Sequence, residues 1–187
     1  MYPDLTLKER VTHGTSKNPL MALHFSAGPE TLYPDRFFAA RHWHSDIELI
    51  LVRKGAYLCE TNLETFRLEE GHFAIVNSEE LHQLTGLGQN TIHDVILFSP
   101  DILDFSYPDE WQEQWIRPFL NHELAFPHTL MPDHPAYPQY FLLFDQILQK
   151  ALAGQKDWYI HCKLLLLNLF VLSAESGLLL SAGQHCP

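Results

Sequence analysis

The stretch HWHSDIELILVRKG, residues 42–55, is the most informative part of the sequence. Its apolar, β-branched second half predicts a strand, in which alternate side chains share one face. His42, His44 and Glu48 have the same parity, so we expect two imidazoles and a carboxylate to project together. Trp43 falls on the opposite face, where we expect it to serve packing.

A third imidazole lies further along the chain. His82 belongs to the run LHQLT, residues 81–85, which comes after a turn at 77–80. If the sheet closes, this strand brings His82 to the same point as the first two histidines. Three neutral imidazoles and one carboxylate form a plausible ligand set for zinc, iron, manganese, nickel or copper. The same residues also suit a hydrogen-bonded polar pocket for an effector, which His93 on the next strand could join.

The flanking sequence predicts a mainly β domain. Over residues 20–98, short apolar runs alternate with turn signals such as Gly28-Pro29 and Lys54-Gly55. A spacing of roughly 8–12 residues favours a sandwich or a small barrel over βαβ units. Residues 1–19 are polar and contain several turn formers, so we expect an N-terminal arm with little structure of its own.

Residues 99–135 are expected to connect the β domain to a pair of C-terminal helices. Seven of the twelve prolines lie within 99–138, and each removes a backbone donor and restricts its neighbour. Such a segment cannot hold long regular elements. We expect short helical pieces, for example around 110–116.

A helical hairpin is predicted over 136–187. The first helix carries an apolar stripe and ends at a possible C-cap, Gly154; the stripe consists of Tyr137, Phe141, Phe144, Leu148 and Leu152. The second helix, from about 157 to 175, is apolar on more than one face. Either the hairpin buries both faces itself, or one face meets the β domain and the other meets a second subunit.

The pattern H-x-H-x3-E-x6-G at 42–55, with Gly71 and His82 further along, resembles the paired motifs of the cupin superfamily. The whole layout is similar to the sensor half of AraC-type transcription regulators. The resemblance implies a double-stranded, jelly-roll-like β-barrel over 20–98. It also implies that His42, His44, Glu48 and His82 lie at the barrel mouth, where their equivalents often coordinate a divalent metal.

The resemblance further implies a non-enzymatic sensor. Its barrel would bind a small polar effector, a sugar or small organic acid, and its arm would respond to that effector. The helical hairpin would form a homodimer, and DNA would be bound only through a helix-turn-helix part absent from this chain. The alternative is a metal-dependent cupin enzyme, a dioxygenase or isomerase, that uses the three histidines and Glu48.

Other catalytic patterns are absent from the sequence. There is no G-x-S-x-G elbow and no P-loop. Cys59 is expected in the middle of a strand, with no cation nearby to lower its pKa, so we do not expect a nucleophile there. His24 is a weaker pocket candidate than His93. The remaining polar candidates are expected on solvated surface: His122, His128 and His134, and the pairs Glu69-Glu70 and Glu79-Glu80.

Composition limits the partners. The 187 residues include 12 Lys+Arg and 23 Asp+Glu, a formal net charge of −11, together with 12 His. Phosphate contacts need clustered Lys and Arg, so these residues are not expected to bind nucleic acid themselves. The three cysteines, Cys59, Cys162 and Cys186, form no C-x-x-C pair, which favours a reducing cytoplasm. The apolar run 164–174 is too short to span a membrane, and residues 1–10 do not resemble a signal peptide.

Overall fold

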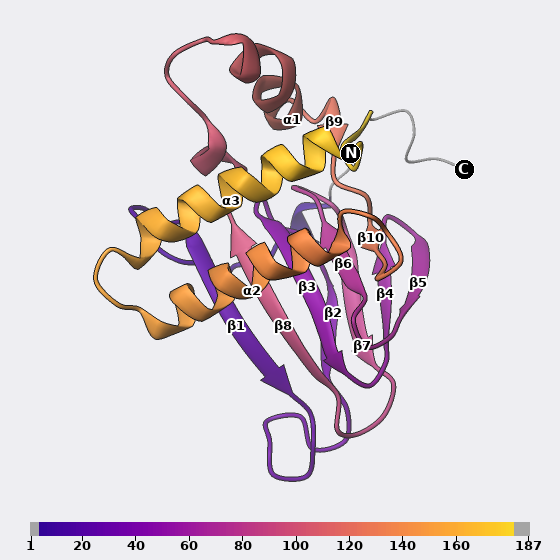
Figure 1. Ribbon diagram of the computed structural model, residues 1–187. Helices are drawn as coiled ribbons and strands as arrows, with labels where there is room; N and C mark the ends of the chain where they lie inside the picture. Colours follow the sequence, from indigo (N-terminus) through magenta and orange to yellow (C-terminus); the bar gives the residue numbers. More distant parts are fainter. Residues whose placement is uncertain (1–3, 182–187) are drawn as a thin grey trace.

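The computed structural model describes residues 4–181, so Cys186 lies outside the described part. Two antiparallel sheets face each other, and two long helices cover the outer side of the larger sheet (Figure 1). This confirms the expected mainly β barrel with a C-terminal helical hairpin. The five-stranded sheet has the order β1 (Leu20–Ser26), β8 (Ile92–Phe98), β3 (Ile47–Lys54), β6 (Phe73–Val76), β10 (Thr129–Leu130). The four-stranded sheet has the order β2 (Phe38–His42), β7 (His82–Gly86), β4 (Tyr57–Thr61), β5 (Glu64–Leu68).

Strand β3 is buried on both faces, which explains its unbroken apolar run. Ile50 and Val52 face the barrel interior, where they pack with residues of the opposite sheet. Leu49 and Leu51 face outward and join the core beneath the helices. Glu48 has the inward parity, so the same alternation carries its carboxylate into the barrel.

Helices α2 (Tyr137–Ala153) and α3 (Trp158–Glu175) form the expected hairpin, and Gly154 caps α2 with a φ of 57°. The buried face of α2 is turned slightly from the predicted stripe: Leu152, which belongs to that stripe, is 52% exposed. The residues of α2 that are buried are Tyr140, Leu143, Phe144, Ile147 and Leu148. Phe144 lies with its ring 5.1 Å from that of Phe73, which ties the helix to the larger sheet.

Helix α3 is covered on one side only within the described chain. Cys162, Leu166 and Leu169 are buried in the core shared with α2 and the sheet. On the other side, Ile160 is 50% exposed and Leu164 is 56% exposed. The hairpin therefore does not bury both apolar faces of this helix by itself.

The connector contains short elements, as its prolines predict: η2 (Pro100–Leu103), the π-helix η3 (Gln112–Ile116), α1 (Arg117–Leu120) and β9 (Leu124–Ala125). It also supplies β10, which extends the larger sheet by pairing with β6. A strand of two residues leaves no periodic signal in a sequence. The same limit applies to β11 (Leu180–Ser181), which pairs with β9.

The N-terminal arm is more ordered than expected. After the short 3-10 helix η1 (Leu5–Leu7), its backbone runs beside the segment after β2: Glu9 N–H donates to the Trp43 carbonyl at 2.9 Å, and Trp43 N–H donates to the Leu7 carbonyl at 3.1 Å. The Trp43 indole N–H also donates to the Asp4 carbonyl at 2.7 Å. Trp43 thus serves packing as predicted, and what it packs against is the arm.

The glycine of the first motif has a steric reason. Gly55 has a φ of +81°, a region that favours glycine, and a Cβ there would lie 2.8 Å from Thr91 Cγ2. Any larger residue would push β3 away from the start of β8.

In the described part of the chain, none of the helices is long and apolar enough to cross a membrane.

Candidate functional site

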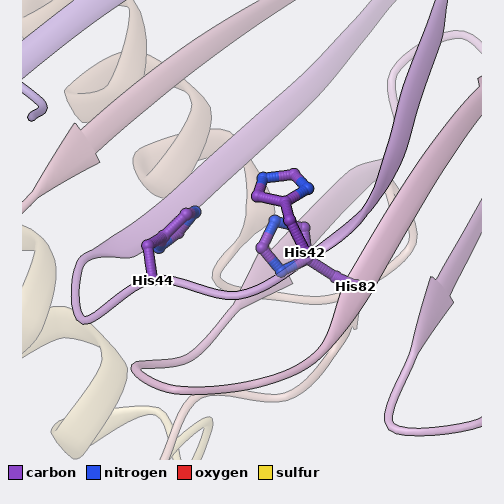
Figure 2. Close-up of side chains that lie close together, drawn as sticks. All are labelled: His42, His44 and His82. Carbon is purple, nitrogen blue, oxygen red and sulfur yellow. The ribbon is translucent and has the colours of Figure 1, made fainter. Parts of the chain in front are cut away.

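Three histidines meet at one end of the barrel, where β2 ends and β7 begins (Figure 2). His42 and His82 are cross-strand partners, and their ring centroids lie 4.2 Å apart. His44 lies just beyond β2 on the loop to β3, with its ring 4.9 Å from that of His82. One nitrogen from each ring lies within 4.8 Å of the others. The cluster is thus the one that strand parity and sheet closure predict.

Backbone carbonyls orient all three rings in the same way. The Nδ1 atoms of His42, His44 and His82 lie 2.7, 3.0 and 2.9 Å from the carbonyl oxygens of residues 40, 46 and 80. A carbonyl only accepts, so each Nδ1 carries a proton. In the neutral rings, the lone pair therefore sits on Nε2. Such second contacts are typical of histidines that are held ready to bind a metal.

Glu48 adds a carboxylate to the cluster. Its Oε2 lies 3.3 Å from His44 Nε2 and 3.2 Å from His82 Nε2. Burial alone would raise the pKa of Glu48, but contacts with His44 and His82 in their protonated forms outweigh burial and hold the pKa well below its usual value. Burial similarly lowers the pKa of His82, and the contact with Glu48 overcomes it, so the net shift is upward.

These residues fit a divalent metal by the chemistry of their donors. Three Nε2 lone pairs and one carboxylate oxygen make an N3O set of the kind that zinc, iron, manganese or nickel accepts. A carboxylate oxygen that faces an unprotonated Nε2 is repulsive unless a proton or a cation lies between them. His42, His44, His82 and Glu48 are therefore the residues that would hold a metal.

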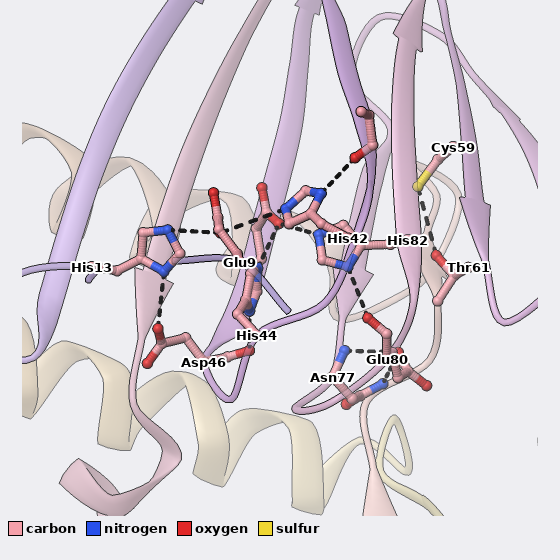
Figure 3. A network of polar contacts seen from close by, with 12 residues as sticks. Glu9, His13, His42, His44, Asp46, Cys59, Thr61, Asn77, Glu80 and His82 are labelled. Atoms are coloured by element: carbon pink, nitrogen blue, oxygen red, sulfur yellow. Dashed lines mark hydrogen bonds and ion pairs between the residues drawn. The ribbon is translucent and has the colours of Figure 1, made fainter. Parts of the chain in front are cut away.

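The arm contributes two residues that sequence reasoning missed (Figure 3). His13 is buried, with Nδ1 2.9 Å from Asp46 Oδ2 and Nε2 3.3 Å from Glu9 Oε2. Glu9 Oε2 also lies 3.6 Å from His42 Nε2. The hydrogen bonds to Asp46 and Glu9 raise the pKa of His13 to about 9, so the arm carries a cation next to the cluster. The only sequence signal was the spacing of an acid and a histidine, four residues apart in a polar segment.

A cavity of about 210 Å³ extends from the cluster along the barrel axis. All five predicted site residues, the fifth being His93, line this cavity together with Glu9 and His13 from the arm. At the far end, His93 Nδ1 lies 2.9 Å from the Tyr57 hydroxyl. Burial lowers the pKa of His93 to about 4, so its ring is neutral. The remaining wall is aromatic and aliphatic, including Phe25, Tyr33, Phe37, Leu23, Ile50, Leu84 and Val95.

Two expectations about the surface were wrong. His128 is buried, with Nε2 3.0 Å from Glu80 Oε1 and Nδ1 3.4 Å from Glu64 Oε2. Glu80 is mostly buried as well, and its hydrogen bond from His128 outweighs burial to lower its pKa. This group fastens β10 to the turn between β6 and β7. A contact between residues 48 positions apart cannot be read from local polarity.

Two further residues have surroundings that local sequence does not reveal. The His24 side chain is half exposed, and its Nδ1 lies 2.6 Å from Asp94 Oδ1. Cys59 is buried among apolar residues, and burial raises its pKa to about 12, which agrees with the expectation that it is not a nucleophile.

A second, larger crevice of about 450 Å³ lies between the rim of the barrel and the connector. It is lined by residues of the turn 77–80, of η2 and of the segment around α1 and β9. None of the five predicted site residues lines it, and its ionisable lining residues are Glu79, Glu80, Asp101 and His122. The barrel cavity is the one that all five predicted site residues line.

Residues 26–153 match the family of AraC-like ligand-binding domains. The chain belongs to this family, and the match runs from the end of β1 through the rest of the barrel and the connector to the end of α2. A comparison with curated proteins finds no match.

Several solved structures share part of the fold. KdgF from Halomonas sp. is 20% identical, with a TM-score of 0.36 over 43% of this chain and 69% of that chain. An HTH_3 family transcriptional regulator from Vibrio cholerae is 15% identical, with a TM-score of 0.37 over 46% of each chain. A predicted oxalate decarboxylase from Thermotoga maritima is 14% identical, with a TM-score of 0.34 over 43% of this chain and 64% of that chain. These likenesses are too partial to carry a functional argument.

Proposed function

We propose that this chain is the effector-sensing and dimerisation domain of an AraC-type transcriptional regulator, which binds a small polar molecule inside its barrel. The observation that carries the proposal is the closure of one cavity by the arm. Glu9 contacts His42 of the cluster, and His13 contacts both Glu9 and the ring of His44. A molecule that enters the cavity must meet both the barrel and the arm.

Binding would then act through linkage. An effector that contacts His42 or His44 competes with Glu9, or adds to its contacts, and so changes the free energy of arm docking. A ligand shifts such an equilibrium by its difference in affinity for the two states. The proposed activity is therefore ligand binding coupled to a conformational change of the arm, and no residue is assigned a catalytic step.

The other parts of the proposal rest on the organisation of the chain. We assign residues 1–19 to the arm, 20–98 to the barrel, 99–135 to the connector and 136–187 to the dimerising hairpin. The exposed Ile160 and Leu164 support a homodimer through α3, because apolar side chains on one helix face gain free energy when a second copy covers them. DNA would be bound in the cytoplasm, through a helix-turn-helix part outside the residues given.

Thermal unfolding with candidate effectors tests the sensor function. We expect at least one small molecule from a panel of sugars, small organic acids and neutral ring compounds to raise the melting temperature. A ligand at 100 times its Kd adds about 2.7 kcal/mol to the free energy of unfolding. The variant His42→Ala should lose this shift, whereas His161→Ala on the exposed side of α3 should keep it. Failure of every compound, together with a monomeric chain, would contradict the proposal.

A metal-dependent cupin enzyme is the second candidate, favoured by the three converging Nε2 atoms and Glu48. A divalent metal there would supply Lewis-acid chemistry. Elemental analysis of the untagged protein separates the two candidates. Near-stoichiometric metal that is lost in His44→Ala and retained in His161→Ala favours the enzyme, and a metal-free protein that still binds an effector favours the sensor.

A further inference from the structure

The far end of the barrel cavity contains a buried polar atom without a partner. His93 is 1% exposed, and its Nδ1 is engaged by the Tyr57 hydroxyl at 2.9 Å. Its Nε2 is fully buried and has no hydrogen-bond partner among residues 4–181. An unsatisfied polar group costs about 1–3 kcal/mol, and such groups in native structures call for an explanation. Because His93 lines the cavity, a bound molecule is the natural partner for Nε2.

The contact with Tyr57 determines what this atom offers. Tyr57 is completely buried, and burial raises the pKa of its phenol to about 12, so the hydroxyl keeps its proton. That proton needs an acceptor; the side chains of His93 and Thr91 both lie within hydrogen-bond reach, and the Nδ1 of an imidazole is a stronger base than a hydroxyl oxygen. When Nδ1 accepts, the neutral ring carries its only proton on Nε2. His93 then presents an N–H donor, so the ligand must bring an acceptor.

The walls around His93 restrict the rest of the ligand. Phe25 stacks on His93 with ring centroids 5.0 Å apart and an angle of 20°, and Phe37 meets it edge-on at 4.4 Å. Tyr33 lies 4.7 Å from Phe37 and closes the aromatic wall. A sugar placed here would leave most of its hydroxyl groups unpaired, at a cost for each one. An aromatic ring pays no such cost, since it can pack against these faces and edges.

Charge and size narrow the class further. Among the described residues, no lysine or arginine lines the cavity, and the protonated His13 at the cluster end is already paired with Glu9 and Asp46. The His93 end therefore offers no cation to an anionic group. A cavity of about 210 Å³ has room for a single ring with small substituents.

We propose that the effector is an uncharged, single-ring aromatic compound with an oxygen acceptor at one end, and that His93 selects it by donating Nε2–H to that oxygen. The other end of the ring would carry a polar group that faces His42, His44 and His82. This inference rests on the proposed sensor function and narrows it, because it sets aside sugars and small organic acids.

A matched pair of probes tests the role of His93. Para-hydroxyacetophenone carries a carbonyl oxygen where para-ethylphenol carries none, and the two molecules are otherwise alike. Titration calorimetry at mildly acidic pH, where both probes are neutral, should show about tenfold tighter binding of the ketone, the value of one hydrogen bond. His93→Phe should bind the two probes equally, and His93→Gln, which keeps an N–H donor, should retain part of the preference.

Tyr57→Phe provides a second variant that leaves His93 in place. Without the phenol, the imidazole is no longer held in one tautomer, so we expect a smaller loss of preference for the ketone. This variant also keeps the test valid if His93→Phe does not fold. Arg67→Met, at an exposed position on β5, is the control and should behave as the unaltered protein.

Two comparison ligands separate this inference from the sensor function itself. Glucose and para-hydroxybenzoate represent the sugars and the organic acids. If either binds and neither ring probe does, the inference is wrong and the sensor function stands. If none of the four compounds binds, the inference is wrong, and the sensor function is wrong as well if the rest of the panel fails and the chain is monomeric. An unchanged preference for the ketone in His93→Phe would show that another residue selects the oxygen.

Discussion

Nδ1 of His13, in the N-terminal arm, lies 2.9 Å from Oδ2 of Asp46, which is on the loop between β2 and β3. This contact, with Glu9 on the other ring nitrogen, connects the N-terminal segment to the rim of the cavity. The docked arm therefore contains a protonated imidazole between two carboxylates. Its docking should depend on pH.

We expect arm docking to weaken as the pH rises from 7 to 9. The pKa of His13 is about 9 when the arm is docked and near 6.5 otherwise, so docking is fully stabilised below pH 6.5 and loses this contribution as the pH passes through 9. Tryptic cleavage after Lys8 and Arg10 reports the undocked arm. His13→Gln should be cut faster at pH 7, and the difference should vanish at alkaline pH. Equal rates for both proteins at pH 7 would contradict this account.

Removal of the Arg53 guanidinium should destabilise the contact between barrel and helix. Arg53 donates to Asp94 at 2.5 Å and to Asp145 of α2 at 2.6 Å, and Asp94 is 3% exposed. Arg53→Met leaves the buried carboxylate with His24 alone, so we expect a loss of roughly 3 kcal/mol in the free energy of unfolding.

Urea denaturation measures this loss, and the chain offers a matched control. Arg67 pairs with Glu69 while both side chains are about 60% exposed, so Arg67→Met should cost at most about 0.5 kcal/mol. Similar losses in both variants would mean that the pairing of Arg53 with Asp94 and Asp145 contributes no more to the free energy of unfolding than an exposed ion pair does.

Truncation of Phe144 should show how much the hairpin depends on the sheet. Its side chain is fully buried against Phe73, so Phe144→Ala should lower the free energy of unfolding by about 3–5 kcal/mol. Leu152 on the same helix is 52% exposed, and Leu152→Ala should change it by less than about 0.5 kcal/mol. Chemical denaturation of both variants gives the comparison, and a small loss for Phe144→Ala would imply that the sheet core repacks without it.

A charge on the exposed face of α3 should prevent the proposed dimer. Leu164→Glu should shift the sedimentation coefficient from dimer to monomer, because an ionised side chain in an apolar interface lacks a partner. Leu32→Glu, at a residue 93% exposed on the β1–β2 loop, is the control and should remain dimeric. A dimer that survives Leu164→Glu would place the interface elsewhere.

Features that local periodicity encodes could be predicted from the sequence. The strand boundaries from 20 to 98 came from short apolar runs and turn residues, and the parity of His42, His44 and Glu48 placed them on one face. Gly154 correctly marked the end of the first long helix. Each of these inferences depends on neighbours a few residues apart.

Contacts between residues far apart in the chain became visible only once the chain was folded. The docking of Glu9 and His13, the burial of His128 against Glu80, and the hydrogen bond between Tyr57 and His93 join positions that share no local pattern. Polar residues in an arm or a connector look solvated in a sequence, because burial depends on what the rest of the chain places over them. Here the closure of two sheets, and the arm laid across their rim, converts three isolated polar segments into parts of the cavity and its supports.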